Sequence, residues 1–580
     1  MKAAAAKPGF FGAIRSSAGF TWPQAAVALA IAAFLLVFLI VPVVTVVYVA
    51  FADGAGGFTL SHFATFFHIS LMHESFWNSL YVGLWSVAIA TIIAVPLAYF
   101  TVRFEFRGAA LIQTLGVLPL IMPPFVGAVA MQLIFGRSGA VNLLLNDWFG
   151  FTIPFMDGLN GVIFVEALHY FPFILMNLVV ALNNIDSSME ESAQNLGSSG
   201  FRLFRRIVFP LAMPGYVAGA ALVFIKVFDD LGTPLVLNVT NMLAPQAYLR
   251  ITSIGIEDPI GYVASVIMVI ASLGALWIST WVMRGKDYAT MQRGYSGLAR
   301  RKLNRGQTVL AYGWIGLVLL IVLSPHIGIL LLSFAKVWSF SVLPDDYTLV
   351  HYATVFQDSP RAIWNTMLFC GIAASLDVVI ATAIAYLMLR TRLPGRNALD
   401  FTVTIALAIP GVVLGIGYLR TFRGIEIPFT DGELLTSSWI LIALAYTVRR
   451  LPYALRSCVA ALQQMHVSLE EAAENLGASK RRTILRVVVP LMAGGMLAGF
   501  ITSFMTAAVE LSTTIMLVSS QNDAPMSYGI YLYMQSAAGR GPGAALGVLA
   551  VLIVAVGTYL SYRVLGSRAQ GASDAQRLTV

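Results

Sequence analysis

Charged side chains are scarce in this sequence. Only 11% of its 580 residues are Asp, Glu, Lys or Arg, and 58% are apolar, whereas about 25% of the residues in soluble domains are charged. Charge this sparse cannot cover the surfaces of several globular domains, so a soluble enzyme is excluded and lipid must be the solvent for most of the chain. The net charge of +8 is typical of a membrane protein whose basic residues record its orientation, and it does not indicate a nucleic-acid partner.

Cysteine and the common catalytic motifs are also missing. The two cysteines, Cys370 and Cys458, lie within separate apolar runs, which argues against a disulfide framework and a thiolate metal site. The sequence has no HExxH, GxSxG or CxxC motif, and its one Gly-Lys pair, Gly285-Lys286, is not followed by Ser or Thr. A phosphate-binding loop of the GxxxxGK[ST] type is therefore absent. We expect no catalytic residue, no metal site and no cofactor bound by this chain.

Long apolar runs recur along the sequence. A bilayer core of about 30 Å is crossed by about 20 helical residues, and runs of this length predict an all-α membrane protein with about twelve transmembrane helices. The expected spans are residues 25–50, 77–100, 109–135, 160–183, 212–236, 261–283, 309–335, 364–388, 399–419, 438–461, 492–518 and 543–563.

The basic residues predict the orientation of these spans. With a cytoplasmic N-terminus, most Lys and Arg residues fall in cytoplasmic segments, as the positive-inside rule expects. Lys2, Lys7 and Arg15 precede a first apolar run that is too long for a signal-peptide core. We therefore expect a retained first helix and, with an even number of spans, both termini on the cytoplasmic side.

The sequence contains an internal repeat. Trp77-Asn78, Arg103 and Pro123 recur as Trp364-Asn365, Arg390 and Pro410 at a shift of 287 residues, and later matches such as Pro172 with Pro452 have a shift of 280. Each half has six expected spans, and an even number keeps both copies in the same orientation, so the repeat is parallel. The expected parts are a cytoplasmic tail (1–23), a first six-helix half (24–283), a basic cytoplasmic linker (284–308), a second six-helix half (309–565) and a cytoplasmic tail (566–580).

The most specific motif lies between the fourth and fifth spans of each half. It reads Glu-Glu-Ser-Ala-Gln-Asn-Leu-Gly at 190–197 and Glu-Glu-Ala-Ala-Glu-Asn-Leu-Gly at 470–477, with six of eight positions identical. This pattern predicts a short helix with acidic residues at its N-terminus, a turn at the glycine and a second, basic helix. A solvated loop without further duty is the alternative, but such a loop has little reason to occur twice at the same spacing.

These motifs resemble a known family. Glu-Ala-Ala, two residues, Leu-Gly, nine residues, Ile, one residue and Leu-Pro form the cytoplasmic signature of permease subunits in binding-protein-dependent ABC importers. Half one departs from it at Ser192 and Phe209, and half two at Val487 and Val489. The resemblance implies the type I ABC importer permease fold, in which this loop is a coupling helix that docks on the ATPase. It assigns that contact to Glu190, Glu191, Ala193, Leu196, Gly197, Glu470, Glu471, Ala472, Ala473, Leu476 and Gly477.

The same resemblance implies the partners. The expected assembly is a bacterial inner-membrane importer with two copies of an ABC ATPase subunit, which use ATP and Mg²⁺, and a periplasmic or lipid-anchored substrate-binding protein. The chain itself is expected to be a transport subunit and not an enzyme. Two other classes fit twelve spans in two parallel halves less well: a secondary transporter that needs no ATPase, and a membrane-bound enzyme.

Ionisable residues inside expected spans are costly and are functional candidates by default. At the shift of 280, Asp230 corresponds to Glu510, and equivalent positions are expected to face a common axis. The alternative is that these charges are structural ion pairs, for example between Arg450 and Glu510. The residues expected along the translocation path are His169, Tyr170, Asp229, Asp230, Thr233, Arg449, Arg450, Glu510, Ser512 and Thr513.

The substrate is less well defined by the sequence. Two fused permease halves, with Asp-Leu-Gly-Thr at 230–233 and Glu-Leu-Ser-Thr at 510–513, look like ferric-iron importer permeases. Those permeases often carry Lys-Glu-Leu-Pro-Ala-Thr in half two, where this chain has Val509-Glu510-Leu511-Ser512-Thr513-Thr514. Permeases for 2-aminoethylphosphonate or another small anion, thiamine, polyamines and sulfate are built alike, so these substrates remain alternatives to iron.

Overall fold

The fold is described by a computed structural model that covers residues 22–54, 56–105, 107–283 and 302–577. Within these ranges the chain is built from helices and has no β-strand, only three isolated β-bridges. The expected all-α membrane fold is confirmed. Residues 1–21 of the expected N-terminal tail and residues 284–301 of the expected linker lie outside the described residues.

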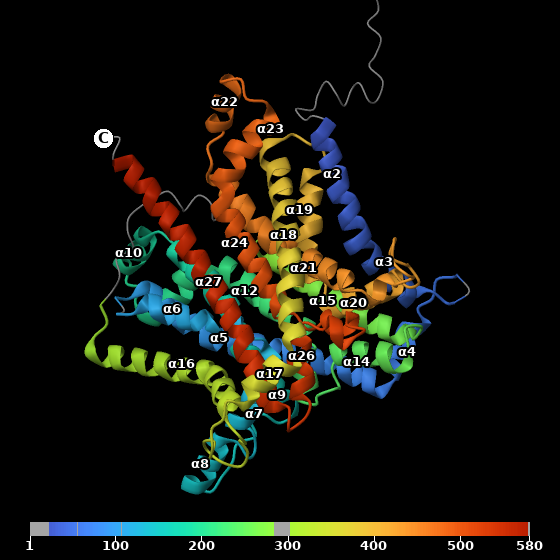
Figure 1. The fold of residues 1–580 in the computed structure, drawn as a ribbon. Helices are drawn as coiled ribbons and strands as arrows, with labels where there is room; N and C mark the ends of the chain where they lie inside the picture. The colour runs from blue at the N-terminus through green and yellow to red at the C-terminus, as the bar shows by residue number, and fades with distance from the viewer. Residues whose placement is uncertain (1–21, 55, 106, 284–301, 578–580) are drawn as a thin grey trace, which may run out of the picture.

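Half one, residues 22–283, contains the blue to green helices of Figure 1. Their bounds are α2 (Trp22–Leu35), α3 (Val41–Phe51), α4 (Ser61–His68), α5 (Ser70–Arg103), α6 (Ala109–Val117), α7 (Pro124–Phe135), α8 (Ala140–Phe149), α9 (Gly158–Asn183), α10 (Ser187–Asn195), α11 (Gly200–Leu203), α12 (Phe209–Asp229), α13 (Gly232–Val236), α14 (Leu243–Leu249) and α15 (Pro259–Met283).

Half two, residues 302–577, repeats this order without a counterpart of α8. Its helices are α16 (Arg305–Phe334), α17 (Val350–Asp358), α18 (Pro360–Arg390), α19 (Arg396–Ile405), α20 (Gly411–Thr421), α21 (Trp439–Gln464), α22 (Ser468–Asn475), α23 (Lys480–Thr483), α24 (Val489–Ala508), α25 (Thr514–Leu517), α26 (Met526–Met534) and α27 (Arg540–Arg577). The last helix therefore continues into the segment expected to be the C-terminal tail.

Ten helical segments in the described ranges are long and apolar enough to cross a membrane, and the bent pair α19–α20 makes eleven. The tenth expected span is α21, which has 26 residues but carries Arg449, Arg450 and Arg456 along its length. These three arginines make α21 more polar than the other long helices, so it is not among the ten apolar segments. Its length and its place in the repeat nevertheless match those of α9. The repeat therefore supplies two sets of six helical segments.

Four of the spans predicted as continuous apolar runs are broken helices in the structure. The third and ninth spans break before Pro124 and Gly411, and the two parts of the ninth meet at 107°. Pro123 and Pro410 lack the N–H group that a continuous helix would need at these points. The fifth and eleventh spans break at Asp230 and Glu510, whose carboxylates accept backbone N–H groups of the next turn.

The first helix of each half packs on the other half. The α2–α3 segment contacts α18, α19 and α20 of half two, and α16 contacts α6 and α7 of half one. Figure 1 shows α2 beside α18 and α19, and α16 beside α6, in both cases next to segments far away in the sequence. The two halves are therefore joined by crossed helices as well as by the linker.

Paired glycines position the fifth span of each half against the fourth. A Cβ atom on Gly219 would lie 2.7 Å from the Ile174 Cα atom, and one on Gly495 would lie 2.3 Å from the Ala461 Cβ atom. Gly215 and Gly499 complete a GxxxG spacing in each half, which lets α12 approach α9 and α24 approach α21 closely. This packing fixes the polar ends of α12 and α24 beside the polar middle parts of α9 and α21.

Candidate functional site

The two acidic motifs form short helices joined to the spans around them. Helix α10 connects α9 to α12 through α11, and α22 connects α21 to α24 through α23. Gly197 and Gly477 end these helices with φ angles of +82° and +86°, the left-handed conformation that glycine adopts most easily. The expected helix, glycine turn and basic second helix are present in both halves.

One glutamate of each motif is anchored to a long helix of the same half. Arg103 at the end of α5 lies 2.7 Å from Glu190, and Arg390 at the end of α18 lies 2.6 Å from Glu470, with all four side chains buried to 90% or more. Arg390 also donates hydrogen bonds to the backbone carbonyl groups at 462 and 465, at the end of α21. The ion pair therefore holds the short helix to the span bundle.

The rest of the motif faces outward. Leu196 is 89% exposed and Leu476 is 90% exposed, and Glu191 and Glu471 are exposed as well, while Ala193 and Ala473 are half-buried. The two adjacent glutamates that begin each motif thus have different surroundings, because the first is buried in an ion pair and the second is exposed. Apolar side chains this exposed are typical of a surface that binds another protein.

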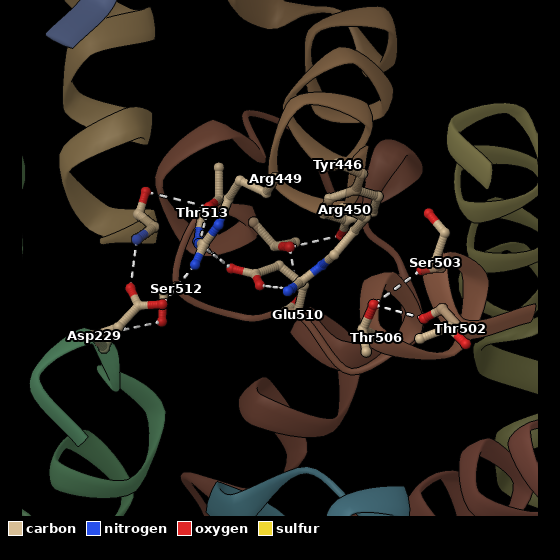
Figure 2. Close-up of polar contacts among 12 residues, drawn as sticks. Asp229, Tyr446, Arg449, Arg450, Thr502, Ser503, Thr506, Glu510, Ser512 and Thr513 are labelled. Atoms are coloured by element: carbon tan, nitrogen blue, oxygen red, sulfur yellow. Dashed lines mark hydrogen bonds and ion pairs between the residues drawn. The ribbon is translucent and has the colours of Figure 1, made fainter. Parts of the chain in front are cut away.

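A buried ion network lies where α12, α20, α21 and α24 meet. Figure 2 shows the Arg449 guanidinium between carboxylates of the two halves: Arg449 Nη2 lies 2.5 Å from Asp229 Oδ2, and Nη1 lies 2.7 Å from Glu510 Oε1. Arg450 forms an ion pair with the other oxygen of Glu510. The ion pair between Arg450 and Glu510, expected as a structural alternative, is therefore present, together with a second one across the two halves.

Hydrogen bonds complete this network. Arg449 Nη1 donates to Thr513 Oγ1 at 2.7 Å, and Ser512 Oγ donates to the Asp229 backbone carbonyl at 3.1 Å. Asp229 also accepts the backbone N–H of Gly411 at the N-terminus of α20, where the helix dipole favours a carboxylate. Half one and half two are thus held together in the interior by one carboxylate, one guanidinium and one helix N-terminus.

The remaining path residues of half one lie apart from this network. Asp230 accepts the backbone N–H groups of Gly232 and Thr233 at 3.3 and 3.0 Å. Tyr170 lies within electrostatic reach of carboxylates of both halves, whereas His169 lines a small apolar cavity with His326 of α16. Of the ten expected path residues, the ion network therefore contains Asp229, Arg449, Arg450, Glu510, Ser512 and Thr513, while Tyr170, Asp230, Thr233 and His169 lie outside it.

This interior is closed in the structure. The ten expected path residues are all at most 9% exposed to solvent. Opening of the interior at this point requires the ion pair between Asp229 of half one and Arg449 of half two to separate.

Three residues of the site were not singled out from the sequence. A Cβ atom on Gly411 would lie 1.7 Å from Arg449 Nη1, so only glycine leaves room for the guanidinium. Arg103 and Arg390 recur at the shift of 287 residues, and this recurrence marks them as positions of interest. The spacing alone does not show that they form ion pairs with the acidic motifs.

Comparison with known proteins agrees with this architecture. The pattern that defines the binding-protein-dependent transport system inner membrane component family matches residues 86–288 and 377–571, one segment in each half. A putative ferric transport system permease protein of Haemophilus influenzae is 29% identical over 452 residues, covering 76% of this chain and 70% of the relative.

Two further relatives show the range of the family. A ferric transport system permease protein of Actinobacillus pleuropneumoniae is 29% identical over 78% of this chain, which spans only 65% of that relative's length. A molybdenum transport system permease protein of Escherichia coli is 29% identical over 36% of this chain and 93% of its own length, the size of a single half. With two matched segments that cover more than half of its length, the chain belongs to the family of binding-protein-dependent transport system inner membrane components.

Proposed function

We propose that this chain is the complete membrane pore of an ATP-driven importer in the bacterial inner membrane, with both termini in the cytoplasm. Two ABC ATPase subunits, which use ATP and Mg²⁺, dock on α10 and α22 with their glycine turns. An external substrate-binding protein delivers the solute on the opposite side. The chain supplies the passage and binds no nucleotide of its own.

The observation that carries this proposal is how α10 and α22 are connected. Helix α22 joins the span that carries Arg449 and Arg450 to the span that ends at Glu510, and Arg390 fixes α22 to a third. A displacement of α22 therefore moves both sides of the buried ion network. Helix α10 likewise joins α9 to α12, which ends at Asp229. A concerted movement of α10 and α22 would therefore separate the halves at the ion pair between Asp229 and Arg449.

Ferric iron is the solute that we propose. The support comes from two relatives, each matched over more than three quarters of this chain, that are named as ferric transport permeases. The molybdenum permease matches one half only, so an oxyanion is the second candidate. In this class of importer the external binding protein would set most of the selectivity.

The proposal is tested by reversing the charge of the exposed motif residues, Glu191→Lys together with Glu471→Lys. Both side chains are exposed, so the variant should insert and fold normally. We expect loss of ATPase co-purification and loss of ATP-dependent iron uptake into proteoliposomes that contain the ATPase and the binding protein.

A matched control places the same charge change at the opposite end of the bundle. Asp431→Lys with Glu433→Lys alters two exposed residues of the loop after α20 and should leave ATPase co-purification unchanged. Uptake by the motif variant that equals the unaltered protein, or uptake that needs no ATP, would show a secondary transporter instead.

A further inference from the structure

A second pair of buried carboxylates lies on the half-one side of the ion network. Glu166 of α9 is completely buried, and the groups that interact with its carboxylate are Asp230 and Thr233. Apart from these contacts within the cluster, neither Glu166 oxygen nor the fully buried Oγ1 of Thr233 has a hydrogen-bond partner within the described residues. Two acidic groups and a hydroxyl therefore face one another without the donors that buried polar groups normally have.

The repeat shows what half two has in the same place. The counterparts of Glu166, Asp230 and Thr233, at the shift of 280, are Tyr446, Glu510 and Thr513. There the glutamate is neutralised by Arg449 and Arg450. In half one the positions of those arginines hold His169 and Tyr170, so half one keeps the acidic residues without the basic ones.

The half-buried Lys226 of half one does not compensate this pair. Lys226 of α12 interacts with Tyr453 and Glu510, on the half-two side. Within the described residues Asp230 accepts two backbone N–H groups, and its carboxyl group also interacts with that of Glu166. Two carboxylates this close inside a bundle are not both ionised unless a cation lies between them, and otherwise they share a proton.

We propose that Glu166, Asp230 and Thr233 form a transient binding site for a hard metal cation on its way through the pore. Carboxylate and hydroxyl oxygens are the ligands that hard cations prefer. This inference rests on the proposed function and adds to it the chemical class of the solute, a cation and not an oxyanion.

The composition of the site fits passage better than storage. The described residues contain no group of three or more His, Cys, Asp or Glu side chains able to hold a metal ion. Two carboxylates leave most positions around a cation to water or to a small chelator, and a site in a conduction path must release its ion. Tyr170 lies within electrostatic reach of Glu166, Asp230 and the half-two Glu510, which places the pair next to the closed junction of the halves.

The test uses Tb³⁺, a hard trivalent ion that becomes luminescent when a nearby tyrosine is excited. The full chain, in lipid nanodiscs with its ATPase partner, is titrated with Tb³⁺ under excess Mg²⁺, with and without ATP. We expect saturable luminescence from the unaltered protein and at least about a tenfold weaker affinity in Glu166→Gln and in Asp230→Asn, because affinity follows the number of ligand charges. Tyr170→Phe should bind Tb³⁺ but lose most of the luminescence.

Asp377→Asn is the matched control. Asp377 is a buried carboxylate on α18 that accepts a hydrogen bond from Ser503, outside the proposed site, so its Tb³⁺ affinity should equal that of the unaltered protein. Equal affinity in Glu166→Gln and the unaltered protein, in both nucleotide conditions, would overturn the proposal and leave a pair that shares a proton.

The outcome separates this site from the importer function. If the Glu191→Lys and Glu471→Lys variant keeps uptake while Glu166→Gln weakens Tb³⁺ binding, the ATP-driven function fails and the cation site stands. If uptake is lost in the first variant while Tb³⁺ binding is unchanged in the second, only the cation site is removed.

Discussion

Replacing Arg390 by methionine should detach α22 from the span bundle. The change removes the 2.6 Å contact with Glu470 and two hydrogen bonds to backbone carbonyl groups, and it leaves the Glu470 carboxylate buried without its partner. Loss of one member of a buried pair costs about 3–5 kcal/mol. A cost of 3 kcal/mol corresponds to local opening of α22 that is more frequent by about a hundredfold.

Hydrogen exchange of the α22 backbone amides measures this opening directly, and ATP-dependent uptake measures its effect. We expect faster exchange confined to α22 and its turns, and uptake reduced by a similar factor while ATPase activity persists. Glu470→Gln added to Arg390→Met should slow the exchange again, because the lone buried charge is gone. Arg392→Met, an exposed arginine two residues further on, is the control. Unchanged hydrogen exchange of α22 in Arg390→Met would refute the reasoning. It would also be refuted if α22 exchanged as fast in the double variant as in Arg390→Met alone.

Three other changes have defined outcomes. Gly411→Ala should cost about 1–3 kcal/mol in thermal unfolding and stop uptake, because the new methyl group overlaps Arg449, whereas Gly371→Ala, with open space around it, should do neither. Leu476→Ala removes an exposed side chain, so stability should be unchanged while ATPase binding, measured by titration, weakens by at least about fivefold. Arg420 and Arg423 lower the pKa of Glu257 from its ordinary 4.5, first through the hydrogen bond from Arg420. The stability that they add is present above pH 4.5 and is lost as the pH falls through the lowered pKa. Glu257→Gln and the unaltered protein should therefore differ in melting temperature at neutral pH and converge in stronger acid, and a difference that does not change with pH would contradict this.

The local features of this chain were predictable from its sequence. Apolar length gave the spans, and the repeated acidic motif located α10 and α22 with their glycine turns. These features depend on residues close together in the chain, so spacing and composition are enough to find them. The apolar runs and the repeated motif also predict the all-α fold and the two related halves, each of which contains one segment matched by the family.

The interior contacts were not predictable in the same way. Asp229 and Arg449 are 220 positions apart, and no periodicity indicates that the end of α12 meets the middle of α21. The breaks at Asp230 and Glu510 likewise depend on carboxylates that accept nearby N–H groups in place of a continued helix. Glu166 lies within an expected span, so its charge is visible in the sequence, but its pairing with Asp230 depends on the packing of α9 against α13.

The crossed first helices have a consequence for how the protein is assembled. Because α2–α3 covers the third span of half two, and α16 covers that of half one, a chain divided within residues 284–301 would give two fragments that each lack part of their own lipid-facing wall. Neither fragment should be stable in detergent by itself, and the two produced together should recover a single particle. The exchange of these helices thus makes the two halves one folding unit, whatever the linker between them does.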